Sequence, residues 1–441
     1  MLTLSDLKSG RLSGEKYVKL SCGLTEFPRE LFELVDSLER LDLSGNQLSR
    51  LPDDFGRFTK LRILFLSNNH FQVLPAVLST CPKLSMIGFK ANRIREIPEG
   101  ALPENLRWLI LTDNRLEKLP VSIGQLGQLQ KLMLAGNRLK ALPPEMRQCG
   151  SLELLRISAN RLEELPEWLV NLPRLSWLAF AGNPCTSRTQ SDHTLAEIHW
   201  DELELEQRLG EGASGIISKA FWQDNFDVAV KEFKGEVTSD GFPADEMAAS
   251  IAAGKHDHLI EVIGQLTGHP EQKSGLLLSL IADDFKNLAG PPCLDSCTRD
   301  TYAEDSVFSL SQLLTITDAI ASAAAHLHQE GITHGDLYGH NILINDAAHC
   351  LLGDFGAATL YKEMNPQLNH AIERIEVRAF GCLLEELLHR INPDSVAGDV
   401  DVVNGLLQLQ QRCLAENTKQ RPAFADIHQA IMVLKSAKNI L

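Results

Sequence analysis

Leu41-Asp-Leu-Ser-Gly-Asn46-Gln-Leu48 is a short pattern that returns, with small changes, along the first 185 residues. Its asparagine recurs at a period of 23 residues with one step of 22, at positions 46, 69, 92, 114, 137, 160 and 183. A proline follows at a constant phase, at positions 52, 75, 98, 120, 143 and 166. Self-similarity at this spacing predicts a solenoid, in which no unit is stable alone and the stacked units form the core.

The seven copies resemble the leucine-rich repeat family over about residues 20–185. The resemblance implies one short strand per unit on the inner face, followed by a turn at the asparagine. The asparagine side chain would hydrogen-bond backbone groups that the tight bend otherwise leaves unpaired. Residues 1–37, with the imperfect unit Leu20-Ser-Cys-Gly-Leu24, are expected to cap the repeats at 38–185.

Side chains alternate between the two faces of a strand, so the repeats also predict which residues face the concave surface. Eight of these positions are large and apolar: Ile63, Phe65, Met86, Trp108, Ile110, Met133, Leu154 and Trp177. Contiguous apolar surface commonly marks a protein interface. This strip is therefore a predicted partner-binding surface, although scattered surface hydrophobes, or a face covered by the chain's own second domain, would give the same pattern.

Charge is divided unevenly between the two halves of the chain. Residues 1–185 carry 24 basic and 20 acidic side chains, whereas the remainder carries 18 and 38. A strongly acidic half is repelled by nucleic acid and anionic lipid, so neither is expected as a partner. A membrane span and a signal peptide are not expected either, because a long apolar run and a basic, apolar start are missing. Nine scattered cysteines without a Cys-x-x-Cys spacing favour reduced thiols and a cytoplasmic protein.

The second half opens with closely spaced glycines in Leu209-Gly-Glu-Gly-Ala-Ser-Gly-Ile-Ile217, followed by the strand-like Val228-Ala-Val-Lys231. Glycines let backbone N–H groups approach phosphates closely, and a lysine neutralises phosphate charge. A lone Gly-x-Gly-x-x-Gly also opens dinucleotide-binding Rossmann units, but there it joins a strand to a helix. Here the glycines lie between two strand-like segments, which disfavours the Rossmann interpretation.

Two acidic motifs follow at His334-Gly-Asp336-Leu-Tyr-Gly-His-Asn341 and Gly353-Asp-Phe-Gly356. Together with the segment from Cys413 to Phe424, their order and spacing resemble tyrosine-kinase-like protein kinases over residues 205 to about 435. The predicted architecture is an α/β leucine-rich repeat solenoid, a linker at 186–204, and a two-lobed α+β protein-kinase-like domain at 205–437.

The resemblance implies a role for each motif in ATP-dependent phosphoryl transfer. Asp336 would accept or orient the proton of the substrate hydroxyl. Lys231, oriented by Glu246, would hold the phosphates of ATP, and Asn341 and Asp354 would hold Mg²⁺. The rest of the predicted ATP site consists of Leu209, Gly210, Gly212, Gly215, Ile217 and Ala229.

The sequence departs from the protein kinase pattern at several positions. Gly335 stands where an arginine is usual, so activation by a phosphate on the activation loop is not expected. Tyr338 and His340 leave the acceptor class open, with serine or threonine as the expectation. Glu376 stands where a helix aspartate is usual, and the 19 residues between Gly356 and Glu376 contain no Ala-Pro-Glu.

Two other functions fit part of these motifs. His-Gly-Asp-Leu-x-x-x-Asn with a short following segment also resembles small-molecule phosphotransferases of the aminoglycoside and choline kinase type, and a pseudokinase scaffold could act through the repeats alone. Asp-Phe-Gly, Val-Ala-Val-Lys and Arg421-Pro-x-Phe favour a protein kinase. The segment from Ala282 to Ser309 is either a surface loop or a part of the substrate cleft. We therefore predict an ATP- and Mg²⁺-dependent protein kinase with a protein partner or substrate on the concave repeat face.

Overall fold

The computed structural model describes residues 4–9, 12–186, 195–212, 214–223, 226–235 and 237–438. The chain divides into two compact units. The first contains Met1–Arg174 and Asn183–Cys185, and the second contains Leu175–Gly182 and Thr186–Leu441. The strand of the last repeat therefore groups with the second unit by its packing.

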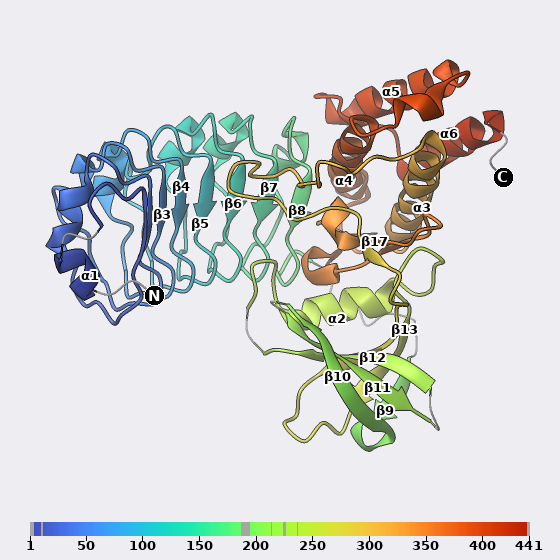
Figure 1. Ribbon diagram of the computed structural model, residues 1–441, viewed down its shortest axis with the longest axis horizontal. Coiled ribbons are helices and arrows are strands. Elements are labelled where there is room, and N and C mark those ends of the chain that lie inside the picture. Colours follow the sequence, from blue (N-terminus) through green and yellow to red (C-terminus); the bar gives the residue numbers. More distant parts are fainter. Residues whose placement is uncertain are drawn as a thin grey trace. The chain divides into compact units, whose positions relative to one another are not determined.

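Parallel strands of three residues each, one per repeat, dominate the first unit (Figure 1). The strands of the first unit pair in chain order and in register. They are β1 (Tyr17–Lys19), β2 (Arg40–Asp42), β3 (Ile63–Phe65), β4 (Met86–Gly88), β5 (Trp108–Ile110), β6 (Lys131–Met133), β7 (Leu154–Arg156) and, in the second unit, β8 (Trp177–Ala179). Helix α1 (Leu4–Lys8) precedes them, and short 3-10 turns such as Val121–Gln125 and Pro144–Gln148 run between them. The predicted solenoid is confirmed.

The recurring asparagines hold the turns together as predicted. The Nδ2 of Asn114 donates to the carbonyl oxygens of Phe89 at 2.9 Å and Leu111 at 3.1 Å, while its Oδ1 accepts from the N–H of Ile94 at 2.9 Å. Asn137 and Asn160 make equivalent bonds one and two repeats further along. Each buried side chain thus satisfies backbone groups of two successive repeats, which links neighbouring units.

The predicted concave column is only partly accessible. Its half-buried members are Ile63, Phe65, Trp108, Ile110 and Met133. The prediction of exposure is wrong for Met86, Leu154 and Trp177, which are 4%, 2% and 1% exposed. Adjacent strands lie only about 4.8 Å apart, so large side chains in register cover one another. Met86, for example, lies between Ile63 and Trp108.

The second unit begins with a six-stranded sheet in the order β10-β11-β12-β14-β13-β9. Its strands are β9 (Ala196–His199), β10 (Leu203–Glu211), β11 (Gly215–Trp222), β12 (Phe226–Phe233), β13 (Val262–Thr267) and β14 (Gly275–Ser279). Helix α2 (Pro243–Ala252) lies beside this sheet (Figure 1). Strand β9 pairs in parallel with β13, so part of the predicted linker contributes an edge strand.

A helical lobe completes the second unit. It contains α3 (Leu310–Gln329), α4 (Pro366–Leu388), α5 (Val400–Cys413) and α6 (Phe424–Ala437), together with the short strands β15 (Lys286–Asn287), β16 (Ile332–Thr333), β17 (Ile342–Ile344), β18 (Cys350–Leu352) and β19 (Thr359–Leu360). Arg421 is fully buried, and its guanidinium donates to the carbonyl oxygens of Ala415 and Arg374. Within the described part of the chain, no helix combines the length and apolarity that a membrane crossing requires. A sheet followed by a helical lobe agrees with the predicted two-lobed domain.

Candidate active site

The glycine-rich segment forms the turn between β10 and β11. Around Gly212, the position of an added Cβ meets no atom within 4 Å, so this part of the turn is open to a ligand. At Gly215 an added Cβ would lie 2.5 Å from the carbonyl oxygen of Glu232, which only glycine avoids. The close approach keeps β11 against β12, the strand that carries Lys231.

Lys231 and Glu246 form an ion pair at the centre of the site. Lys231 extends from β12 and contacts the Glu246 carboxylate on α2, and their side chains are only 14% and 3% exposed. Helix α2 begins at Pro243, which suits the first turn of a helix, and it carries Glu246 in that turn. The structure therefore brings together two residues that sequence order alone had paired.

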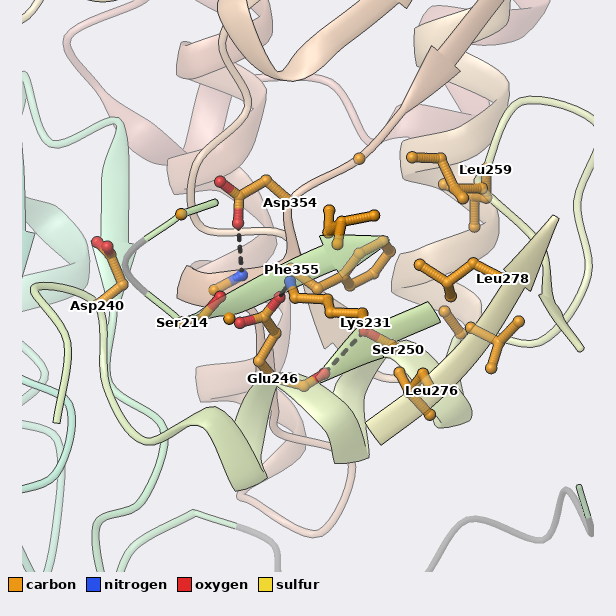
Figure 2. A pocket seen from close by; sticks show the side chains of 18 of the residues that line it. Ser214, Lys231, Asp240, Glu246, Ser250, Leu259, Leu276, Leu278, Asp354 and Phe355 are labelled. Atoms are coloured by element: carbon orange, nitrogen blue, oxygen red, sulfur yellow. Dashed lines mark hydrogen bonds and ion pairs between the residues drawn. The ribbon is translucent and has the colours of Figure 1, made fainter. Parts of the chain in front are cut away.

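A pocket of about 240 Å³ surrounds this ion pair. Figure 2 shows Asp354 and Asp240 on one side of the pair, and Leu259, Leu276 and Leu278 on the other. The pocket therefore has a polar part near the glycine-rich turn and an apolar recess. Its further lining includes Ile217, Ser250, Val262, Gly353 and Phe355.

Asp354 has an unusual backbone conformation, with φ of 57° and ψ of 80°. Its Oδ1 accepts from the N–H of Gly356 at 3.1 Å, and the next side chain, Phe355, is buried. Non-glycine residues rarely adopt this left-handed region, and such conformations cluster at functional sites. The carboxylate is consequently presented to the pocket from a turn that hydrogen bonds hold.

The loop at residues 334–341, the catalytic loop, carries Asp336 and Asn341, which are hydrogen-bonded to each other. The Nδ2 of Asn341 donates to Asp336 at Oδ2 (3.0 Å) and at the backbone oxygen (2.9 Å). The buried His334 contacts the carbonyl oxygen of Gly353 through Nε2 at 2.8 Å. Gly353 also donates its N–H to the carbonyl oxygen of Asn341. The loop is thereby tied to the residue that precedes Asp354.

Not every predicted ATP-site residue lines the pocket. Leu209 and Gly210 lie on β10 outside the pocket, with 47% of the Leu209 surface exposed, and Ala229 is buried in the middle of β12 opposite Leu278. Leu259, Val262 and Leu276 line the pocket but were missed. They lie in apolar stretches of sequence, which offer no signal that distinguishes a pocket wall from core.

Glu376 on α4 is buried and holds the catalytic loop at Gly335. Its Oε1 accepts from the N–H of Gly335 at 2.7 Å, and its Oε2 contacts Nε2 of His328 at 2.8 Å. Burial opposes the charged form, but His328, His334 and the Gly335 N–H outweigh it and lower the pKa of Glu376. A charged carboxylate can therefore hold the backbone directly before Asp336.

The segment from Ala282 to Ser309 reaches the catalytic loop. Asp300, whose side chain is fully buried, contacts Nδ1 of His340 at 2.7 Å and accepts from the His340 N–H at 3.1 Å. Burial disfavours the imidazolium, but Asp300, Asp336 and Asp354 together raise the pKa of His340. Part of this segment thus supports the site, and no sequence motif around Asp300 indicates this contact.

Trp177 belongs to the site's surroundings and not to an open surface. Its ring stacks on that of Tyr338 with centroids 4.2 Å apart and planes 5° apart. Its Nε1 donates to the carbonyl oxygen of Leu337 at 3.0 Å. This packing within the second unit is the reason why the predicted exposure of Trp177 is wrong.

Comparison with known proteins agrees with this arrangement. A leucine rich repeat family model matches residues 20–71 and 127–184, and the model described as protein tyrosine and serine/threonine kinase matches residues 203–386. The chain joins leucine-rich repeats to a protein kinase domain.

Similar curated proteins include protein kinases and a leucine-rich repeat protein. The kinase domain is similar to chicken (Gallus gallus) serine/threonine-protein kinase mos, with 28% identity over 46% of the chain and 62% of that protein. Human (Homo sapiens) protein-tyrosine kinase 6 is 26% identical over 55% of the chain and 60% of its own length. The repeats are similar to mouse (Mus musculus) leucine-rich repeat and calponin homology domain-containing protein 1, with 36% identity over 25% of the chain and 16% of that protein. The chain thus spans less than two thirds of the length of these relatives.

Proposed function

We propose that the kinase domain transfers the γ-phosphoryl group of ATP to a hydroxyl group of a protein. One observation carries the proposal: the Lys231–Glu246 ion pair and Asp354 line one pocket, and the linked Asp336 and Asn341 adjoin it through Gly353. Phosphoryl transfer relies mainly on positioning and charge neutralisation, and these are the groups that it uses.

The groups present suit ATP and Mg²⁺. Open backbone at Gly212 and the ammonium group of Lys231 suit a polyphosphate. Magnesium prefers hard oxygen ligands and commonly shares them between one or two protein side chains and the phosphates. Asp354 offers a carboxylate, and Asn341 offers its amide oxygen because its nitrogen donates to Asp336. The ion would neutralise charge on the phosphates.

In the proposed transfer step, Asp336 acts as the general base. Its carboxylate accepts the proton of the acceptor hydroxyl, whose oxygen bonds to the γ-phosphorus as the bond to the β–γ bridging oxygen breaks and ADP leaves. Two hydrogen bonds from Asn341 hold Asp336 in place. Lys231, held by Glu246, keeps the remaining phosphates in position.

We further propose a serine or threonine acceptor, recruited through the concave face of the repeats. Recruitment through this face is supported by the half-buried apolar set Ile63, Phe65, Trp108, Ile110 and Met133, which offers contact area to a protein. A reducing compartment such as the cytoplasm suits the nine cysteines, all of which are free thiols.

The test is incubation with Mg·ATP and acceptor proteins, followed by intact-mass measurement. Asp336→Ala and Asp354→Ala should each lower phosphate incorporation by about 100-fold or more, because each removes a group that acts on the reacting atoms. Asp346→Ala is the matched control, since its side chain is 93% exposed and makes only a 3.9 Å ion pair with Lys286. ATP-analogue binding without any mass gain in the wild type would favour a scaffold. Turnover of small alcohols or amines but not proteins would favour a small-molecule phosphotransferase.

A further inference from the structure

The strand of the last repeat, β8, lies against the catalytic loop within the second unit. Trp177 is 1% exposed, stacks on Tyr338, and donates its indole N–H to Leu337. Leu337 and Tyr338 are the two residues that directly follow Asp336 in the chain. One side chain of β8 therefore contacts both the backbone and a side chain of the loop that carries the proposed base.

The residues that flank β8, Ser176 and Phe180, extend this contact. The N–H of Phe180 donates to the Thr359 hydroxyl at 3.3 Å, on the strand β19 that follows the Asp354 motif. Arg378 of α4 donates to the Ser176 hydroxyl at 2.7 Å. Residues 176–180 thus contact three segments of the kinase domain, namely the catalytic loop, β19 and α4.

The backbone of β8 also accounts for the glycine before Asp336. Gly335 has a φ of +73°, a conformation that residues with a side chain rarely adopt. A Cβ at this position would lie 2.5 Å from the carbonyl oxygen of Ala357 and 2.9 Å from that of Leu178. The last repeat strand therefore helps to fill the space in which an arginine side chain would begin.

We infer that β8 is a built-in positioning element of the kinase domain, in which Trp177 holds the catalytic loop so that Asp336 faces the acceptor hydroxyl. The inference rests on the proposed phosphotransferase function and adds to it a positioning residue from the repeat sequence. The rigid Trp177–Tyr338 stack and the bond to Leu337 fix the loop on one side. Glu376 fixes it on the other through Gly335. A loop held in this way needs no arginine and no phosphate on the activation segment to order it.

The experiment compares Trp177→Ala and Trp177→Phe with Trp168→Ala in the full chain. Trp168 is the matched control, because it directly precedes the 3-10 turn between β7 and β8 and lies outside the strand column. Trp177→Ala should lower kcat by about 10- to 100-fold, since small displacements of reacting groups have effects of this size. The KM for ATP should change less than about threefold, because Lys231 and the glycine-rich turn are untouched. Trp177→Phe keeps an aromatic ring and should recover most of the loss.

Hydrogen–deuterium exchange gives a readout that does not require activity. Peptides covering residues 334–341 should exchange faster in Trp177→Ala than in the wild type, whereas α3 and α6 should be unchanged. Unchanged kcat, or unchanged exchange of the loop, would overturn the inference. An inactive wild type would refute the proposed function alone, because loop exchange still decides the role of Trp177. If Trp177→Ala fails to fold, Tyr338→Ala removes the other ring of the stack and should give the same loss of kcat and the same faster exchange of the loop.

Discussion

Trp108 and Trp177 occupy the same position of their repeats, at the start of strands β5 and β8, and yet they lie in different surroundings. Trp108 is half-buried, with the ammonium group of Lys131 4.3 Å from its ring centroid. Trp177 is fully buried against Tyr338. Equal positions in a repeat therefore guarantee the same side of the strand but not the same accessibility.

The different accessibility of Trp108 and Trp177 shows that one surface of the repeats lies in two different environments. Strands β3, β5 and β6 keep half-buried apolar side chains that the proposed partner would cover, whereas the equivalent side chain of β8 is buried inside the kinase domain. A cation over an indole ring, as at Trp108, leaves part of the ring available for further contact. An indole that stacks on a ring and donates its only N–H has no such capacity, so Trp177 cannot serve a partner.

The largest expected effect comes from placing an arginine at position 335, where protein kinases commonly have one. Gly335→Arg should lower phosphate incorporation by about 100-fold or more, because the side chain would collide with the carbonyl oxygens of Ala357 and Leu178. Radiolabelled ATP and the intact-mass assay measure the loss. Gly127→Arg is the control, since Gly127 is exposed and an added Cβ meets no atom within 4 Å. A gain of activity in Gly335→Arg would refute the role of β8 in excluding the arginine.

A smaller effect is expected at the open tryptophan. Trp108→Glu should weaken partner capture by about tenfold or more, because aromatic anchors contribute much of the binding energy of protein interfaces. Proteins captured by the immobilised chain are quantified by mass spectrometry, and those lost with Trp108→Glu are then tested as phosphate acceptors. Trp168→Glu introduces the same charge outside the strand column. Equal capture by the two variants would contradict recruitment through the concave face.

The comparison also shows which features sequence reasoning can predict. The asparagine ladder follows from local chemistry, because each turn needs a partner for its buried backbone groups, and the structure has these bonds. The Lys231–Glu246 pair followed from motif order along the chain, and the structure brings the two side chains together. Periodicity and motif order were thus sufficient for the solenoid, for the kinase fold and for this ion pair.

Contacts between distant segments were not predictable in this way. Trp177 and Leu337 are 160 residues apart in the chain, and Asp300 and His340 are 40 residues apart. Asp300 also lies in a segment without a recognisable motif. The alternation rule gives a side chain's face, but whether another segment covers that face is a property of the tertiary fold. The apolar lining by Leu259 and Leu276 was missed for the same reason.

The smallest expected effect is a pH dependence of thermal stability that differs between the two units. His256 and His326 stack with centroids 5.0 Å apart, and His258 lies 5.7 Å from His256. Burial lowers the pKa of His256, and the neighbouring charges of His326, His258 and His428 lower it further against the opposing effect of Asp257. Burial likewise lowers the pKa of His258 against the opposing hydrogen bond to the Cys350 carbonyl oxygen. The charge of His349 lowers this pKa further, and those of Asp257 and Asp318 oppose it.

A histidine with a lowered folded-state pKa is charged more readily in the unfolded chain. Its contribution to stability is therefore complete above the ordinary value of about 6.5 and is lost as the pH falls through the lowered value. The unfolding midpoint of the kinase unit should fall by about 2 to 4 °C between pH 7.5 and pH 5.5 for each kcal/mol lost in this way. Scanning calorimetry should show a smaller decrease in His256→Gln, whereas His70→Gln in the repeats, an exposed histidine, should behave as the wild type. An identical acid shift in His256→Gln and the wild type would show that carboxylates, and not this histidine, set the acid sensitivity of the kinase unit.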